Sequence, residues 1–228
     1  MEIKILQLLG GAEKAEGLTV IIDVFRAFTT ECYMMDRGVK AIIPVGDLKL
    51  AYALKDRTPG LILVGERKGK KCEGFDYGNS PAQVLRAELL GKTAVHTTSA
   101  GTQGIANAHN ASEILTGSLV NARATAEYIK RKNPGVVSLV CMGYEAKTEA
   151  REDTLCAEYI RSLLLDMPMD PAGFADALRG AGARFFDPAN RDVYPEEDFW
   201  LCVQADKFPF ALRVDRRESG NVIVREDV

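Results

Sequence analysis

The sequence predicts an α/β fold in which helices cover both faces of a largely parallel or mixed sheet. Short runs of β-branched and other apolar residues alternate along the chain with longer amphipathic stretches, a pattern typical of βα units. The apolar runs are nearly continuous, as in strands that are buried on both faces. The 228 residues, 46% of them hydrophobic and 27% charged, are enough for one large α/β domain or two small ones.

Strand and helix signals follow one another through the first two thirds of the chain. From the apolar runs we expect strands near residues 3–8, 18–23, 40–45, 61–64, 92–97, 112–115 and 136–141. From the helical periodicity we expect helices near residues 27–37, 47–56, 81–90, 102–109, 119–132 and 150–166. The third of these helices has a clear start, because Pro81 suits the first helical position and Ser80 suits its cap.

The rest of the chain, residues 168–228, has a different composition and begins with a stretch rich in proline, aspartate, glycine and aromatic residues. The elements expected here are a short helix at 171–180, strands at 201–203 and 208–214, and an edge hairpin that turns at Ser219–Gly220. We expect a single α/β domain over residues 1–228, in which residues 168–228 are the part that would form a second lobe.

Composition and charge exclude several classes of protein. The formal net charge of −3 provides no basic field for nucleic acid, and no apolar run approaches the roughly 20 residues of a membrane span. The N-terminus lacks the pattern of a signal peptide, so we expect a cytoplasmic protein without a membrane partner. Five scattered cysteines and two histidines argue against a structural zinc site.

An acid and an arginine follow the second predicted strand. The apolar run from Leu18 to Ile22 leads into Asp23, and Arg26 falls in the first turn of the next helix. A carboxylate at a strand end suits Mg²⁺, and an arginine beside it can bind a phosphate or a sulfonate with paired hydrogen bonds. The alternative is that Asp23 only caps the helix and Arg26 is a surface charge. The Asp-x-Asp motif of haloacid-dehalogenase phosphatases is excluded, because Phe25 occupies its second acidic position.

A second polar cluster follows the strand predicted at 61–64. Gly65-Glu66-Arg67 begins a long glycine-rich loop that ends at the Pro81 helix. Loops of about 15 residues without secondary structure are uncommon, and they are usually functional when they are not disordered. The site candidates in this loop are Glu66, Arg67, Asp76, Asn79 and Ser80, of which Ser80 also suits a helix cap.

Turns rich in small hydroxyl residues follow two later strands. At helix N-termini, their backbone N–H groups and hydroxyls can converge on an anion, and the alternative is that they only cap the helices. The anion-binding candidates are Thr97, Thr98, Ser99, Gly101, Thr102, Ser118 and Asn121. His96, just before the first turn, could face the site or the core. In the helix at 150–166, Asp153 is preferred to Glu152 as the acid that faces the cleft.

These motifs, in this order, resemble the 2-phosphosulfolactate phosphatase family. The matching residues are Ile22-Asp23-Val24-Phe25-Arg26-Ala27-Phe28-Thr29-Thr30, Gly65-Glu66-Arg67, Gly74-Phe75-Asp76-Tyr77-Gly78-Asn79-Ser80-Pro81, Thr97-Thr98-Ser99-Ala100-Gly101-Thr102 and Gly117-Ser118-Leu119-Val120-Asn121-Ala122, within about residues 18–160. The resemblance implies a three-layer α/β/α sandwich. It also implies an Mg²⁺-dependent hydrolase that converts 2-phospho-3-sulfolactate into sulfolactate and phosphate, a step of coenzyme M biosynthesis. On this interpretation Asp23, Arg26, Glu66 and Arg67 are catalytic, and Asp23 holds Mg²⁺ with help from Glu66, Asp76 or Asp153.

The sequence departs from the family pattern at a few positions. Phe25 and Phe28 stand where smaller or aliphatic residues are expected, and Ser99-Ala100 stands where an asparagine directly before the glycine is usual. These departures concern the substrate more than the reaction class. The alternatives are a phosphatase of another phosphorylated hydroxy acid and a non-catalytic protein that binds small sulfonates or phosphates. As partners we expect a small anionic substrate and a second copy of the chain, because homodimers are the commonest oligomers.

Overall fold

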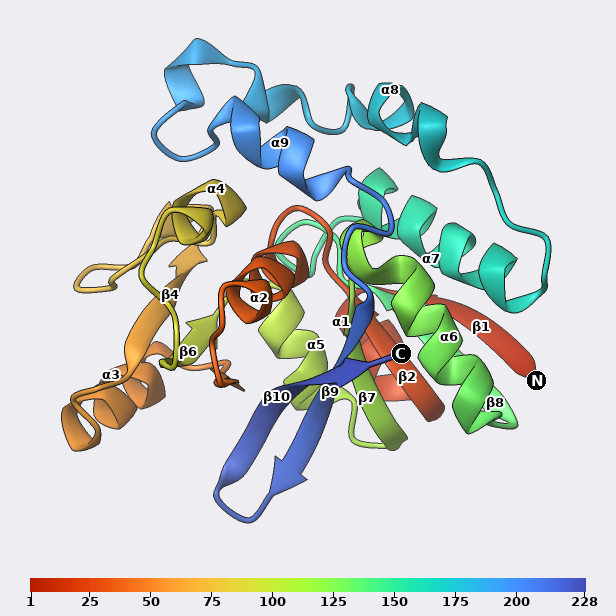
Figure 1. The fold of residues 1–228 in the computed structure, drawn as a ribbon, viewed down its shortest axis with the longest axis horizontal. Coiled ribbons are helices and arrows are strands. Elements are labelled where there is room, and N and C mark those ends of the chain that lie inside the picture. Colours follow the sequence, from red (N-terminus) through yellow and green to blue (C-terminus); the bar gives the residue numbers. More distant parts are fainter.

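The computed structural model describes residues 1–228 and shows a ten-stranded sheet with helices on both faces (Figure 1). The strands are β1 (Glu2–Gln7), β2 (Gly17–Ile22), β3 (Ala41–Pro44), β4 (Ile62–Arg67), β5 (Lys70–Lys71), β6 (Thr93–Thr97), β7 (Ala111–Gly117), β8 (Val136–Cys141), β9 (Phe210–Arg217) and β10 (Gly220–Asp227). The helices are α1 (Leu8–Lys14), α2 (Ala27–Asp36), α3 (Leu48–Arg57), α4 (Pro81–Leu85), α5 (Gly101–Asn107), α6 (Ala122–Lys132), α7 (Arg151–Leu164), α8 (Phe174–Leu178) and α9 (Glu196–Cys202). Short 3₁₀ turns lie at Leu119–Asn121, Pro171–Gly173, Ala183–Phe185 and Pro188–Asn190. The predicted three-layer α/β/α sandwich with a mixed sheet is confirmed.

The sheet consists of two parallel groups of strands that a C-terminal hairpin joins. Its order is β1-β8-β2-β7-β9-β10-β3-β6-β4-β5, and β9 and β10 are antiparallel to each other and to their neighbours. The hairpin itself is correctly predicted, but its predicted place at an edge is wrong, because it fills the centre of the sheet. Its apolar residues explain this position, since Leu212 and Val214 of β9 and Ile223 of β10 are buried in the main core.

Alternate residues of the buried strands face different helical layers. On β2, Ile21 packs in a core with helices α1, α2, α4 and α5, whereas Val20 and Ile22 pack in a second core with α6 and α7. A smaller third core lies between α3 and strands β3, β4 and β6. Ile42 of β3 and Ile62 of β4 share the first core with Ile21, so α2 and α5 pack against strands of both parallel groups.

The strands and helices predicted for the first two thirds of the chain are confirmed, with boundaries shifted by a few residues. Helix α1 was not anticipated, because Gly10 and Gly11 weaken its helical signal. The strand predicted at 201–203 is wrong, because Leu201 and Cys202 end helix α9. The acidic first turn of α9, directly after Pro195, is typical of a helix start.

Residues 166–203, here called the C-terminal segment, cross the end of the molecule at which β2 and β8 lead into their following loops. In Figure 1 the segment runs along the top of the view from α8 to α9, beyond α4 and α7. Aromatic pairs hold it in place. Phe185 lies edge to face on Phe25 with ring centroids 5.2 Å apart, and Phe186 lies on Phe199 at 4.9 Å. The segment therefore touches the loop that follows β2.

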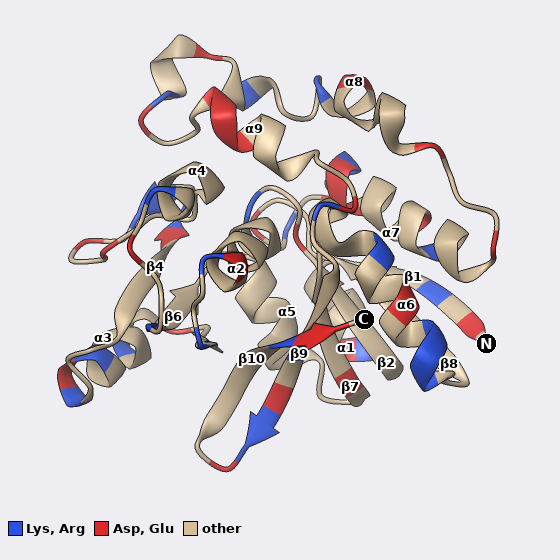
Figure 2. Ribbon diagram, in the orientation of Figure 1, with Lys and Arg blue, Asp and Glu red and all other residues tan.

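Charged residues of both signs are distributed over the molecule, in keeping with the small formal net charge of −3. Figure 2 shows basic and acidic residues together on helices such as α3 and α6 and at the ends of the hairpin, whereas α5 carries neither. None of the helices combines the length and the apolar character that crossing a membrane requires.

Candidate active site

A small polar cleft of about 40 Å³ lies where several loops meet under the C-terminal segment. The lining residues are Asp23, Phe25 and Arg26 after β2, Glu66 and Gly69 at the end of β4, Asn79 before α4, Ser99 and Ala100 after β6, Gly143, Tyr144 and Glu145 after β8, and Arg184 and Tyr194 from the C-terminal segment. The structure thus brings together the polar clusters that follow three predicted strands.

Asp23 connects the starts of two helices and also faces the cleft. Its Oδ1 accepts a hydrogen bond from the backbone N–H of Ala27 at 3.1 Å, and its Oδ2 accepts one from Gly101 at 3.0 Å. Burial raises the pKa of Asp23 to about 7, and the negative charge of Glu66 adds to this rise while the two N–H groups oppose it. Asp23 therefore serves as the helix cap of the alternative interpretation and is also available to a ligand.

Glu66 connects the loops that follow β4 and β6. Its Oε1 accepts a hydrogen bond from the backbone N–H of Ser99 at 2.6 Å, and its Oε2 accepts one from Gly69 at 2.6 Å. The Ser99 hydroxyl also donates to Oε2 at 3.1 Å. Glu66 is buried yet lines the cleft, so its carboxylate is held at a fixed place beside Asp23.

Asp153 lies behind the cleft and joins two of its loops. Its Oδ1 accepts a hydrogen bond from the backbone N–H of Val24 at 2.8 Å, and its Oδ2 accepts one from Gly143 at 2.8 Å. Burial raises the pKa of Asp153 well above its usual value, and the charges of Asp23 and Glu152 act in the same direction. The prediction that Asp153 faces the cleft is wrong, because Asp153 does not line the cleft and both its oxygens bind backbone.

The cleft fits Mg²⁺ held by two carboxylates. No three His, Cys, Asp or Glu side chains are arranged as a complete metal cage. Mg²⁺ does not need one, since it commonly takes one or two carboxylates and completes its shell with water and substrate oxygens. Asp23 and Glu66 both line the cleft, and each of their oxygens keeps acceptor capacity beyond its backbone hydrogen bonds. Burial is the main cause of the raised pKa of Asp23, and the charge of Glu66 adds to it; a cation beside the two carboxylates would oppose both effects.

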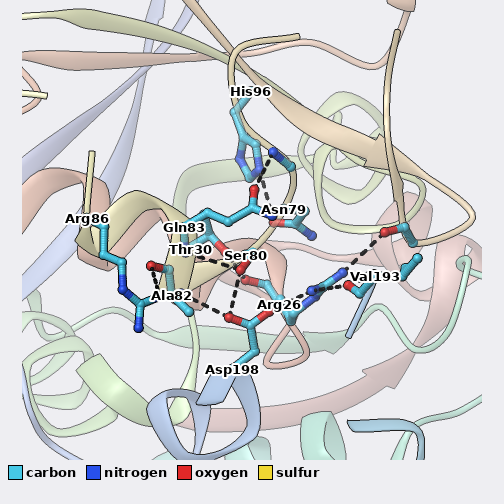
Figure 3. A network of polar contacts seen from close by, with 12 residues as sticks. Arg26, Thr30, Asn79, Ser80, Ala82, Gln83, Arg86, His96, Val193 and Asp198 are labelled. Carbon is cyan, nitrogen blue, oxygen red and sulfur yellow. Dashed lines mark hydrogen bonds and ion pairs between the residues drawn. The ribbon is translucent and has the colours of Figure 1, made fainter. Parts of the chain in front are cut away.

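Arg26 is a buried arginine and not the surface charge of the alternative interpretation. Its Nη1 donates to the carbonyl of Val193 at 2.8 Å and to Asp198 Oδ2 at 2.7 Å, while Nη2 donates to the carbonyl of Gly69 at 3.3 Å (Figure 3). Its guanidinium carbon lies 4.7 Å from the centre of the Tyr194 ring. Arg26 thus borders the cleft and ties the loop after β2 to the C-terminal segment.

Asp198 is the buried partner of Arg26, and sequence reasoning missed it. Besides Arg26, it accepts hydrogen bonds from the Ser80 hydroxyl at 2.8 Å and from the Ala82 backbone N–H at 2.9 Å (Figure 3). The sequence showed only an acidic patch at residues 196–198. A signal was present, because Asp198 stands three and four residues before Leu201 and Cys202, which places it on the apolar face of α9.

Two predicted site residues of the β4 loop do not line the cleft. Arg67 donates from Nη2 to the Gly46 carbonyl at 3.1 Å and to Thr97 Oγ1 at 2.8 Å. Asp76 accepts a hydrogen bond from the Leu63 backbone N–H at 2.8 Å and has a side chain that is 40% exposed. Both side chains fasten the loop to its strands, so the structure does not bring Asp76 together with Asp23 as a shared metal site.

Most of the small polar candidates act as caps, as the alternative interpretation predicts. The Thr98 and Thr102 hydroxyls accept hydrogen bonds from each other's backbone N–H at 3.2 and 3.1 Å. Ser80 accepts one from Gln83 at the start of α4, at 3.3 Å, and the side chain of Asn121 accepts one from the Ser118 backbone at 2.9 Å. Thr97, Thr98, Thr102, Ser80, Ser118 and Asn121 are outside the cleft lining, whereas Ser99 and Asn79 belong to it and the Gly101 N–H holds Asp23.

His96 faces the core and supports Asn79 from behind. Its Nδ1 lies 2.8 Å from Glu31 Oε1, and its Nε2 lies 3.4 Å from Asn79 Oδ1 (Figure 3). The Thr116 hydroxyl donates to the other Glu31 oxygen at 3.2 Å. Burial raises the pKa of Glu31, and its hydrogen bond with His96 opposes that rise. This buried chain of contacts fixes the amide of Asn79 at the cleft wall.

We expect Gly101→Ala to destabilise the protein by about 1–3 kcal/mol, because a Cβ there would overpack the wall behind Asp23. The new atom would lie 2.9 Å from the Phe28 ring and 3.0 Å from Asp23 Oδ2. Urea unfolding would measure the change. Gly10→Ala is the control, since Gly10 is an exposed helical glycine with open space around it, and that change should stabilise by roughly 0.5–1 kcal/mol. Equal stability of the two variants would contradict the packing described for Gly101.

The fold and the cleft together define a class of protein, an α/β protein whose buried acids and arginines surround a site for a small anionic ligand. Comparison with known sequences identifies the family. Residues 5–190 match the sequence profile of the family described as 2-phosphosulpholactate phosphatase, and the chain belongs to this family. The resemblance on which the motif analysis relied is therefore confirmed.

Relatives in several bacteria agree with this assignment. A protein from Caldicellulosiruptor saccharolyticus, named probable 2-phosphosulfolactate phosphatase, is 41% identical over 155 residues, which cover 66% of this chain and 64% of that protein, slightly less than two thirds. Proteins of the same name from Bacillus subtilis and Caldanaerobacter subterraneus are each 30% identical. These two matches cover 92% and 91% of this chain, and 92% and 90% of the relatives, so the likeness extends to the C-terminal segment.

Proposed function

We propose that this protein is an Mg²⁺-dependent phosphoric monoester hydrolase that converts 2-phospho-3-sulfolactate and water into 3-sulfolactate and phosphate. The observation that carries the proposal is the pair Asp23 and Glu66, two buried carboxylates that line one cleft, which arginines also border. The names of the relatives supply the substrate, and the likeness to two of them extends over nine tenths of the chain. Two of the departures noted in the sequence, Phe25 and Ser99-Ala100, line this cleft, which makes the substrate the part of the proposal that most needs a test.

In the proposed reaction Asp23 and Glu66 would hold Mg²⁺, which would neutralise phosphoryl charge and lower the pKa of a water molecule. The chain itself positions the substrate. The Asn79 amide, held by His96, is a donor at the cleft wall, and Arg26 adds positive charge close by. Phe25 and Tyr194 cover the cleft and limit its contact with water, which strengthens each of these interactions.

The test is phosphate release from 2-phospho-3-sulfolactate, with Mg²⁺ and with a chelator in its place. We expect release only with Mg²⁺, and Asp23→Asn should lower it by about 10³-fold or more, because one charge of the proposed metal site is lost. Asp47→Asn is the control, since Asp47 is an exposed cap of α3 whose amide would keep the cap. Unchanged release by Asp23→Asn would remove the role given to Asp23. Binding of 3-sulfolactate without any turnover would favour the non-catalytic alternative.

A further inference from the structure

Of the two arginines that line the cleft, Arg184 has the fewer hydrogen-bond partners in the protein. Arg26 directs three hydrogen bonds at two carbonyls and at Asp198. Arg184 makes a single ion pair, with its Nη2 atom 3.6 Å from Glu152 Oε1, a distance longer than a charge-assisted hydrogen bond. Its Nε is buried and has no hydrogen-bond partner. A buried N–H group without a partner is costly, so this atom marks a place where a ligand acceptor is missing.

Aromatic rings fix the Arg184 guanidinium at the cleft. Its Cζ lies 5.2–5.7 Å from the centres of four rings, those of Phe25, Tyr144, Phe185 and Tyr194. Such rings stabilise the positive charge and exclude water, but they accept none of the in-plane N–H groups. Arg184 is therefore preorganised, and beyond its long ion pair with Glu152 it keeps donors that can bind an anion.

The cleft offers two different environments for anionic groups. The phosphoryl group carries the higher charge and suits the acids that would hold a divalent cation, Asp23 and Glu66. A sulfonate carries a single charge spread over three oxygens, which suits a weakly hydrated guanidinium among aromatic rings. The neighbours of Arg184 in the lining include Tyr144, from the loop after β8, and Tyr194, so this second environment is built largely by residues outside the phosphate motifs.

We propose that Arg184 binds the sulfonate of the substrate and thereby selects a phosphorylated hydroxy acid that carries a second strong-acid group. This inference rests on the proposed function for the identity of the phosphorylated group. It makes the C-terminal segment, through Arg184, the part of the chain that determines specificity. It also assigns a role to Phe25, a residue that departs from the family pattern, because its ring is one of the four around the Arg184 guanidinium.

A matched pair of substrates tests the proposal. 2-Phospho-3-sulfolactate and 2-phospholactate share the phosphate and the carboxylate and differ only by the sulfonate. We expect Arg184→Gln to lower kcat/KM for 2-phospho-3-sulfolactate by on the order of 10- to 100-fold, the range for a lost charge-assisted hydrogen bond. For 2-phospholactate, kcat/KM should change by less than about threefold. Equal losses on both substrates, or no loss on either, would overturn the assignment.

Arg179→Gln is the control for loss of a stacked arginine. Arg179 lies 4.4 Å from the Phe186 ring centre, in the same segment, but it does not line the cleft. Arg179→Gln should leave kcat/KM unchanged for both substrates. Urea unfolding should show that Arg184→Gln and Arg179→Gln are both folded.

Direct binding separates this inference from the proposed reaction. Titration calorimetry with 3-sulfolactate and with lactate needs no turnover. If the wild-type protein hydrolyses neither substrate but binds sulfolactate better than lactate, and Arg184→Gln removes that preference, the role of Arg184 holds and the proposed hydrolysis fails. If the wild type hydrolyses phosphosulfolactate and Arg184→Gln retains the full preference for it, the hydrolysis holds and the role of Arg184 fails. A wild-type protein that neither binds sulfolactate nor hydrolyses its phosphate ester would contradict both.

Discussion

Asp198→Ala is expected to lower the free energy of unfolding by about 3–5 kcal/mol, the usual cost of removing one partner of a buried ion pair. Asp198 is fully buried, and Arg26 is only 3% exposed. The carboxylate accepts hydrogen bonds from Arg26, from the Ser80 hydroxyl and from the Ala82 backbone. Its loss leaves a buried guanidinium without a counter-charge and frees the start of α4 from the C-terminal segment. Activity should fall with stability, because Arg184 and Tyr194 reach the cleft from that segment.

Urea unfolding and phosphate release together measure this effect. The control is Glu197→Ala on the same helix, because Glu197 pairs with Arg86 at a site where both side chains are well exposed, and such pairs contribute at most about 1 kcal/mol. The double variant Arg26→Met/Asp198→Ala should lose less stability than the sum of the single variants, since it leaves no unpaired charge. Equal losses for Asp198→Ala and Glu197→Ala would show that the buried pair does not hold the segment.

The parts of the cleft that the sequence predicted are those encoded by local pattern. An apolar run followed by a polar cluster marks the end of a buried strand, and this pattern located Asp23, Glu66 and Ser99 correctly. Capping patterns are equally local, which is why Ser80 was recognised as a cap. In each case the deciding residues lie within a few positions of one another.

What the sequence could not predict depends on contacts between distant segments. Through the hairpin, the strand directions place β3 antiparallel to β7, so a flat sheet would set the carboxyl ends of the two parallel groups at opposite edges. The Gly101 N–H nevertheless reaches Asp23 from the other group. The sheet must therefore twist strongly between the groups, at a junction where β10 and β3 share the single pair Ile223 and Ile42. No local pattern encodes that bend.

Three charged residues were predicted wrongly or were not predicted: Arg67, Arg184 and Asp198. Arg67 resembles a cleft residue because it follows Glu66, but the period of two along a strand turns neighbouring side chains to opposite sides. Arg184 and Asp198 were not predicted because their partners, Phe25 and Arg26, lie more than a hundred residues earlier in the chain. Charge in a proline- and aspartate-rich segment suggests a solvated surface. The spacing of Asp198 to Leu201 and Cys202 indicates a buried face, but only the tertiary structure shows that its partner is Arg26.

In the absence of divalent cations, the stability of the wild-type protein should fall as the pH rises from about 4 to about 7, and Asp23 should be a main cause. Its pKa is raised by burial from 3.8 to about 7, with Glu66 adding to the rise. Between these values the unfolded chain has lost the proton that the folded protein still holds. The unfolded state then binds fewer protons, so the free energy of unfolding decreases with pH. The stabilising contribution is complete below pH 3.8 and is lost above pH 7, and it amounts to about 4 kcal/mol at 1.36 kcal/mol per pKa unit.

Asp23→Asn should flatten this slope, and the difference between the two pH curves isolates the contribution of Asp23. The variant removes one titrating group, and it also removes the charge that helps burial to raise the pKa of Asp153. Asp47→Asn, at an exposed cap, should keep the wild-type slope. If the cleft holds Mg²⁺ as proposed, the cation competes with the proton, so added Mg²⁺ should raise the melting temperature more at pH 8 than at pH 5. Parallel pH curves for the wild type and Asp23→Asn would contradict the raised pKa of Asp23.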